Sequence, residues 1–188
     1  MAKRQVLLTG TGGQGLILAA IMLAEAAVNA GENVVQSQSY GPEARGGASK
    51  AEVIISDAAI NFPKVQKPEV VLAMSEAAYK KYGLNLPEDA VLIIDNTYVR
   101  EYKTRNTNFY ALPITKLTRS QFGSEQSSNV VALGAVAAIS GMLPFEIVRE
   151  AVLARAPKGT GERNLKALEL GWQLGIDAQA PVSCGNAG

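Results

Sequence analysis

Two glycine-rich segments carry the residue types that are best suited to chemistry in this chain. The first is Gly10-Thr-Gly-Gly-Gln-Gly15, which follows the apolar run Val6-Leu-Leu. A helix is expected after it, so this glycine loop forms a strand-to-helix turn beside exposed helix amides. That geometry favours a negatively charged ligand or partner. The candidate contact residues are Gly12, Gly13, Gln14 and Gly15.

The first glycine loop also matches the spacing of a dinucleotide-binding turn, G-x-G-x-x-G, through Gly10, Gly12 and Gly15. A NAD site requires in addition an acidic residue near the end of the second strand, but residues 34–39 offer only amides and hydroxyls there. Three interpretations stay open: a NAD or FAD site, a site for another phosphate-bearing ligand, and glycines that only permit close packing of a strand, a helix or a partner subunit.

The second glycine segment is Ser39-Tyr-Gly-Pro-Glu-Ala-Arg-Gly-Gly47. It places Tyr40, Glu43 and Arg45, followed by Gly46, on one short loop, and we expect these four residues to contact a ligand or a partner subunit. The planar guanidinium of arginine suits a phosphate or a carboxylate. The alternative is structural, with local ion pairs of Glu43 and Arg45 and a tyrosine packed at the sheet edge.

The composition excludes several kinds of active site. The chain has no histidine, so it cannot supply a catalytic imidazole, a Ser–His–Asp set or a histidine metal ligand. Its single cysteine, Cys184, cannot form an internal disulfide or a four-thiolate iron–sulfur cluster. We therefore assign no catalytic residue and no metal ligand, and we expect no cofactor to be bound by this chain alone.

The charge pattern argues against nucleic acid and membrane partners. The 18 basic and 17 acidic residues nearly cancel, and no run of lysine or arginine concentrates positive charge. No uninterrupted apolar stretch reaches the roughly 20 residues of a membrane span, and the N-terminus lacks the apolar core of a signal peptide. The expected location is cytoplasmic.

The hydrophobic pattern alternates between short apolar runs and helical periodicity. It predicts strands at residues 5–9, 34–39, 49–56, 70–74, 90–95 and 108–112, and helices at residues 16–30, 76–82, 114–122, 129–140, 144–154 and 161–175. This order predicts an α/β fold with a Rossmann-like, mainly parallel sheet flanked by helices and a helical C-terminal third. Residues 1–176 form one domain, residues 177–188 a flexible tail, and both glycine segments lie at one edge of the sheet.

Other polar residues have structural alternatives. Asp95, at a strand end, either faces the same crevice or caps a helix or closes a turn. Residues 124–129 are predicted to cap the following helix, with Asn129 in a crevice as the alternative. The segment Lys158-Gly-Thr-Gly-Glu-Arg163 lacks the spacing of a P-loop and is interpreted as a connection between helices. Trp172 is assigned to the core.

Together the two glycine segments and the run Asn129-Val-Val-Ala-Leu-Gly-Ala-Val-Ala-Ala138 resemble the gamma subunit of 2-oxoacid:ferredoxin (or acceptor) oxidoreductases. The resemblance extends over residues 3–174. It implies a multisubunit enzyme that decarboxylates a 2-oxoacid on thiamine diphosphate and Mg, passes electrons through iron–sulfur clusters to ferredoxin, and forms an acyl-coenzyme A.

The resemblance also implies a division of labour. Alpha, beta and, in some complexes, delta subunits would carry the cofactors, while this chain would support assembly and the coenzyme A side of the site. A separate chain of this length favours the 2-oxoglutarate or branched-chain 2-oxoacid class, with pyruvate as a further candidate. The alternative function is a stand-alone Rossmann-like nucleotide-binding or regulatory module.

Overall fold

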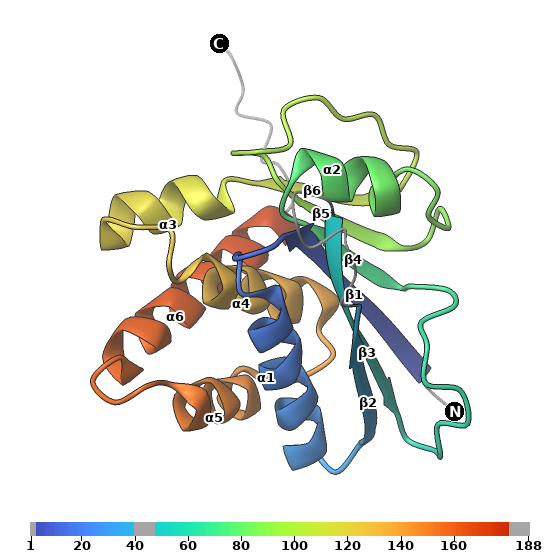
Figure 1. Ribbon diagram of the computed structural model, residues 1–188, viewed down its shortest axis with the longest axis horizontal. Helices are drawn as coiled ribbons and strands as arrows, with labels where there is room; N and C mark the ends of the chain where they lie inside the picture. The colour runs from blue at the N-terminus through green and yellow to red at the C-terminus, as the bar shows by residue number, and fades with distance from the viewer. Residues whose placement is uncertain (1–2, 40–47, 181–188) are drawn as a thin grey trace.

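The computed structural model describes residues 3–39 and 48–180, and within these ranges six strands form one sheet in the order β2-β3-β1-β4-β5-β6 (Figure 1). The strands are β1 (Lys3–Thr11), β2 (Asn33–Gln38), β3 (Ala48–Ser56), β4 (Val70–Ala73), β5 (Val91–Asp95) and β6 (Asn108–Leu112). The pairings β1–β4, β4–β5 and β5–β6 are parallel, whereas β3 pairs antiparallel with both β1 and β2. The expected mainly parallel α/β sheet is confirmed, with β3 as its reversed strand.

The direction of β3 follows from the chain that precedes it. A parallel connection needs a crossover of about a dozen or more residues, which is more than residues 39–47 supply between β2 and β3. The chain therefore returns beside β1 in the opposite direction, and Ala48 pairs with Thr11. This return brings Ser39 and Ala48, on either side of residues 40–47, to the edge of the sheet at which β1 ends.

Helices cover both faces of the sheet. The helices α1 (Leu16–Asn29), α4 (Ser128–Ser140), α5 (Phe145–Arg155) and α6 (Gly161–Gln179) gather on one face, at the left in Figure 1. The other face carries α2 (Glu76–Ala78), which continues into the π-helical turn η2 (Tyr79–Gly83). The last helix, α3 (Ile114–Phe122), follows β6. Alternate residues of β1 divide between the two faces: Val6 and Leu8 join the larger apolar cluster, and Leu7 joins the smaller one.

The element boundaries agree closely with the sequence expectations, with two differences. The predicted helix 76–82 is a short α-helix that passes into the π-helical turn, and Ser75 caps it by accepting a hydrogen bond from the amide of Ala78 at 3.2 Å. Helix α6 continues to Gln179, so residues 177–179, which we expected in a flexible tail, belong to the helix. The remaining tail residues, from 181, lie outside the described part of the chain.

Helices α4 and α6 lie parallel with their backbones in contact. A Cβ atom placed on Gly134 would lie 2.5 Å from the carbonyl oxygen of Leu168, and one on Gly171 would overlap the carbonyl oxygen of Val131. Further along, Gly175 packs on Ala138 in the same way. Because the paired positions advance together along both helices, the two N-termini lie at the same end. The nearly uncharged sequence of α4 reflects its burial on almost all sides.

No helix within residues 3–39 and 48–180 is both long enough and apolar enough to cross a bilayer. In the same ranges, aspartate, glutamate and cysteine side chains do not gather in groups of three or more that could hold a metal ion.

Replacing Gly171 by alanine tests the contact between the two helices. The added methyl group meets backbone rather than a movable side chain, so we expect a loss of about 3 kcal/mol in the free energy of unfolding. The matched control is Gly161→Ala in the same helix, where the new Cβ finds its nearest neighbour, Leu153, at 3.8 Å. Chemical denaturation of both variants measures the difference, and equal stabilities would contradict the tight backbone contact.

Candidate functional site

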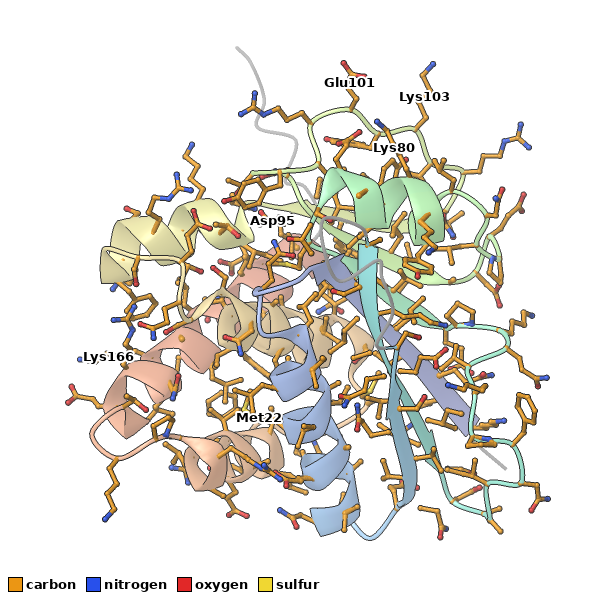
Figure 2. The ribbon with its side chains drawn as sticks, viewed as in Figure 1. Met22, Lys80, Asp95, Glu101, Lys103 and Lys166 are labelled. Atoms are coloured by element: carbon orange, nitrogen blue, oxygen red, sulfur yellow. The ribbon has the colours of Figure 1, made fainter. Side chains whose placement is uncertain are left out.

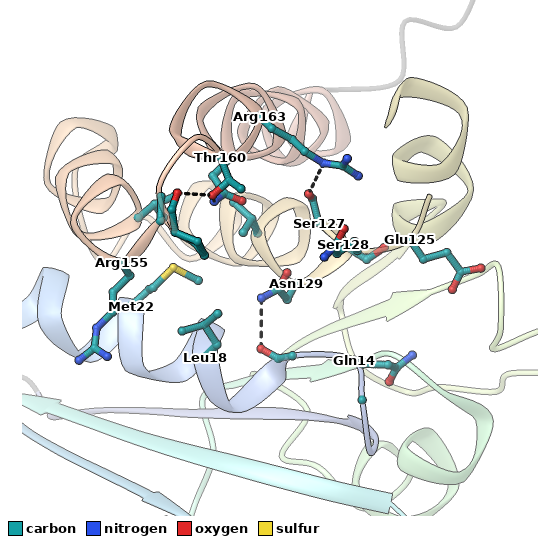
Figure 3. A pocket seen from close by; sticks show the side chains of 18 of the residues that line it. Gln14, Leu18, Met22, Glu125, Ser127, Ser128, Asn129, Arg155, Thr160 and Arg163 are labelled. Carbon is teal, nitrogen blue, oxygen red and sulfur yellow. Dashed lines mark hydrogen bonds between the residues drawn. The ribbon is translucent and has the colours of Figure 1, made fainter. Parts of the chain in front are cut away.

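A cavity of about 490 Å³ lies where the N-termini of α1, α4 and α6 converge (Figure 3). The first glycine loop and the start of α1 form one wall, the start of α4 forms the floor, and the start of α6 with the end of α5 closes the opposite side. Each helix N-terminus carries unpaired amides and a partial positive charge. The convergence of three such ends makes the cavity suited to an anion.

The side chain of Gln14 fixes the first glycine loop. Its Oε1 accepts a hydrogen bond from the amide of Thr11 at 2.7 Å, and its Nε2 donates to the carbonyl oxygen of Met74 at 3.0 Å. Gly10 leaves room for this arrangement, because a Cβ atom there would overlap Gln14 Oε1. Gln14 is therefore a positioning residue that ties the loop to the end of β4.

Gly15 and Asn129 join the loop to α4. Gly15 has φ of +71°, a conformation that side-chain-bearing residues rarely adopt, and its missing Cβ would lie 2.9 Å from Asn129 Nδ2. That amide nitrogen donates to the carbonyl oxygen of Gly15 at 3.3 Å (Figure 3). Asn129 thus lines the crevice, which was the alternative that the sequence left open for it.

Arg163 supplies the positive side chain of the cavity. Its Nε donates to Ser127 Oγ at 3.1 Å and its Nη2 to Ser124 Oγ at 2.7 Å, while the guanidinium lies 5.5 Å from the ring centre of Phe122. Within the described ranges it has no carboxylate partner at ion-pair distance. The cavity therefore keeps an uncompensated positive charge.

The start of α4 does not use the predicted side-chain cap. Its N-cap residue is Ser127, whose hydroxyl receives the hydrogen bond from Arg163 and caps no amide of the helix. The next residue, Ser128, lines the cavity and is only 6% exposed. Its hydroxyl is buried without a hydrogen-bond partner. A buried polar atom without a partner costs free energy, which makes this hydroxyl a candidate contact for a ligand atom.

Arginines neutralise the carboxylates near the cavity. Arg155, which lines it, forms a two-pronged hydrogen bond with Glu25 on α1, and this hydrogen bond lowers the pKa of Glu25. Glu125, on another wall, pairs with Arg119, whose hydrogen bond lowers the pKa of the Glu125 carboxyl. The phenol of Tyr98 also donates to Glu125 at 2.8 Å, which raises the pKa of that phenol.

Of the predicted contact residues, Gly13, Gln14 and Gly15 line the cavity, whereas Gly12 is an exposed residue of the same loop outside its lining. The other four, Tyr40, Glu43, Arg45 and Gly46, lie outside the described residues. The flanks of their segment are close to the first loop, since Ser49 Oγ donates to the carbonyl oxygen of Gly10 at 3.2 Å.

Asp95 and Trp172 take the structural alternatives. Asp95 is fully buried and accepts hydrogen bonds from the amides of Thr97 at 3.1 Å and Thr115 at 3.2 Å, so it closes a turn and caps the first turn of α3. Trp172 packs edge-on against Phe145 with ring centres 5.2 Å apart. Neither side chain lines the cavity.

Sequence reasoning missed Arg163 and Ser128 as site residues. The segment 158–163 was interpreted only as a connection, but only residues 158–160 connect α5 to α6, and residues 161–163 form the first turn of α6. A usable signal was present, because a cation in the first turn of a helix opposes the helix dipole and is unfavourable there without an anion nearby. The unpaired hydroxyl of Ser128 has no such signature in the sequence.

The strand order argues against a dinucleotide site. In the Rossmann arrangement the second strand lies directly beside the first, so that its acidic residue reaches the ribose. Here β3 lies between β2 and β1, so the end of β2 is further from the first glycine loop than in the Rossmann arrangement by one strand spacing, about 5 Å. The polar residues at that end are Gln36, Ser37 and Gln38, without a carboxylate.

Comparisons with known proteins identify the family. The model of the pyruvate ferredoxin/flavodoxin oxidoreductase family matches residues 5–174. The 2-oxoglutarate synthase subunit KorC of Methanocaldococcus jannaschii is 39% identical over 175 residues, which cover 92% of this chain and 94% of the relative.

Comparison with solved structures leads to the same family. The gamma subunit of a keto/oxoacid ferredoxin oxidoreductase from Geobacter sulfurreducens matches with a TM-score of 0.84 and 41% identity over 93% of this chain and 99% of that one. A 2-oxoglutarate:ferredoxin oxidoreductase from Magnetococcus marinus, solved with 2-oxoglutarate, coenzyme A and succinyl-CoA bound, shares the fold, with a TM-score of 0.80 and 22% identity over 94% of this chain and 32% of that one. The chain belongs to the pyruvate ferredoxin/flavodoxin oxidoreductase family and is a gamma-type subunit of a 2-oxoacid:ferredoxin oxidoreductase, not an enzyme that acts alone.

Proposed function

We propose that this subunit belongs to a 2-oxoglutarate:ferredoxin oxidoreductase, which converts 2-oxoglutarate to succinyl-coenzyme A and passes the electrons to ferredoxin. The support is the similarity to 2-oxoglutarate synthase subunits along nearly the whole length of both chains. Relatives named for ketoisovalerate and indolepyruvate match at lower identity. A branched-chain 2-oxoacid is the second candidate substrate.

The other subunits would carry the redox and decarboxylation chemistry. Thiamine diphosphate, Mg and the iron–sulfur clusters are assigned to alpha, beta and delta partners, because a single cysteine cannot hold a cluster and because no group of three or more acidic or cysteine side chains that could hold a metal ion occurs among the described residues. Ferredoxin would meet the complex through those partners. The inferred location of the assembly is the cytoplasm.

The cavity at the three helix N-termini would bind a phosphate-bearing part of coenzyme A. The observation that carries this proposal is the positive charge of Arg163 in the cavity lining, which no carboxylate offsets among the residues described. The helix amides and the hydroxyl of Ser128, which is buried without a partner at the start of α4, are further candidate donors. The volume of about 490 Å³ lies in the usual range for small-molecule sites.

In this function the subunit binds and orients the acyl acceptor. The thiamine diphosphate of the complex would supply the acyl group, and this chain would hold the far end of coenzyme A so that its thiol reaches the partner's site. Gln14 and Asn129 position the first glycine loop through their hydrogen bonds to Met74 and Gly15. A rigid loop binds an anion with little loss of conformational entropy.

Purification of the native complex tests the assignment to a 2-oxoglutarate enzyme. We expect the chain to co-purify with subunits that hold thiamine diphosphate and iron–sulfur clusters. We also expect kcat/KM for 2-oxoglutarate to exceed the values for 2-oxoisovalerate and pyruvate by roughly tenfold or more. A higher kcat/KM for 2-oxoisovalerate than for 2-oxoglutarate would assign the enzyme to the branched-chain class instead.

Replacing Arg163 by glutamine tests the cavity as a coenzyme A site. Loss of a charge-assisted contact to phosphate should raise the KM for coenzyme A roughly tenfold in the assembled enzyme, with the KM for the 2-oxoacid unchanged. The matched control is Lys166→Gln, one turn further along α6, where the lysine pairs with Glu162 at the surface. If both variants keep the wild-type KM for coenzyme A, the cavity is not its site.

The variant Ser128→Ala tests the unpaired hydroxyl. Since Ser128 Oγ is buried without a partner in the protein, its removal should raise the melting temperature of the free subunit, while the KM for coenzyme A rises by about fivefold. Ser140→Ala, at the last turn of the same helix and outside the cavity lining, serves as the control. An unchanged KM for coenzyme A would mean that the hydroxyl contacts no part of this ligand.

A further inference from the structure

The connection between β5 and β6, residues 96–107, crosses above α2 and η2 as a long loop without regular secondary structure (Figure 1). Connections of this length are uncommon in compact domains, and ordered ones usually serve a function. The loop lies outside the cavity lining, so the proposed coenzyme A site does not account for it.

Buried groups hold this loop in one conformation. The phenol of Tyr79, which is only 2% exposed, donates to the carbonyl oxygen of Lys103 at 2.7 Å and accepts from the amide of the same residue at 2.9 Å. Asn106 Nδ2 donates to the carbonyl oxygen of Pro87 at 2.6 Å, and the amide of Asn106 donates to Thr104 Oγ1 at 3.0 Å. The loop is therefore preorganised before any partner arrives.

The side chains that the loop presents are cationic and aromatic. Arg100, Lys103 and Arg105 are exposed, and no carboxylate within the described ranges lies at ion-pair distance from them. Tyr102 is 42% exposed, with its ring centre 5.1 Å from that of Phe109. Figure 2 shows Lys103 and Glu101 extending outward from the top of the molecule, with Lys80 close by. We call residues 100–105 the basic loop.

Arginine and tyrosine are the residue types that contribute most often to the energetic centres of protein–protein contacts. Within the basic loop three cations stand against one anion, Glu101, whereas the whole chain carries a net charge of only +1. Because the backbone is already fixed, docking would cost little ordering entropy. The half-exposed tyrosine favours a lasting contact over a brief encounter, since its ring becomes desolvated only in a stable interface.

We propose that the basic loop is the docking surface for an acidic face of another subunit of the same oxidoreductase. This proposal rests on the membership in the multisubunit family and is independent of the proposed coenzyme A site. The partner would place carboxylates opposite Arg100, Lys103 and Arg105 and an apolar depression against Tyr102. Charges arranged in this way set the orientation of docking and the rate of association.

The test is a charge reversal, Arg100→Glu, Lys103→Glu and Arg105→Glu together, in the reconstituted complex. We expect the dissociation constant of this subunit from its partners to rise roughly 100-fold, and dissociation to begin at a lower salt concentration, as measured by sedimentation and native mass spectrometry. The matched control reverses the same number of charges elsewhere, with Lys3→Glu, Lys67→Glu and Lys158→Glu, and should assemble normally.

A milder set of variants distinguishes a loss of docking from a folding defect. Glutamine at the same three positions should give an intermediate loss of affinity, while the melting temperature of the free subunit stays at the wild-type value. Unchanged affinity and unchanged salt dependence in the reversed variant would overturn the proposal. Intact assembly with a raised KM for ferredoxin would overturn it as well, because the loop would then serve the electron acceptor.

Discussion

The backbone contact between α4 and α6 is the constraint on which the cavity depends. Gly134, Gly171 and Gly175 remove the side chains that would otherwise hold the two helices apart. The helices run parallel, so the close approach sets their two positive ends side by side, an arrangement that electrostatics disfavours. Packing energy from the buried α4 offsets this repulsion, and an anion in the cavity would relieve it. Tight packing and the positive charge at this end of the cavity are thus two results of one contact.

The placement of Arg163 follows the same reasoning. A guanidinium in the first turn of α6 adds to the positive charge of the helix ends instead of reducing it. The serine hydroxyls of Ser124 and Ser127 accept its hydrogen bonds without neutralising it, whereas Arg155 and Arg119 nearby are matched by Glu25 and Glu125. The cavity therefore concentrates its unmatched charge at one wall, where a bound anion would offset the cost in folding free energy.

Much of the fold could be predicted from the sequence because local signals specify it. Apolar alternation marks the strands, and glycines with positive φ, such as Gly31 and Gly141, end the helices where the pattern predicts. The reversal of β3 was not predicted, since it depends on which strands pair and not on the pattern within one strand. The first glycine loop could be singled out as a candidate site because all of its residues are consecutive.

The rest of the site escaped prediction for a physical reason. Ser128 and Arg163 meet only when α4 and α6 pack in parallel, and no local pattern states which two helices will pack. The expectation that residues 124–129 cap α4 was wrong for the same reason. The hydroxyls of Ser124 and Ser127 accept hydrogen bonds from Arg163 of the distant helix α6 instead of from amides of α4. Tyr40, Glu43, Arg45 and Gly46 stay predictions, as they lie outside the described residues.

The cavity and the basic loop are connected through one hydrogen bond. Tyr98, at the start of the connection that carries the basic loop, donates to Glu125, which lines the cavity and pairs with Arg119. The segment between α3 and α4 is thus held from one side by Tyr98 and Arg119 and from the other by Arg163. The wall of the cavity at Glu125 is therefore positioned in part by the connection that carries the basic loop.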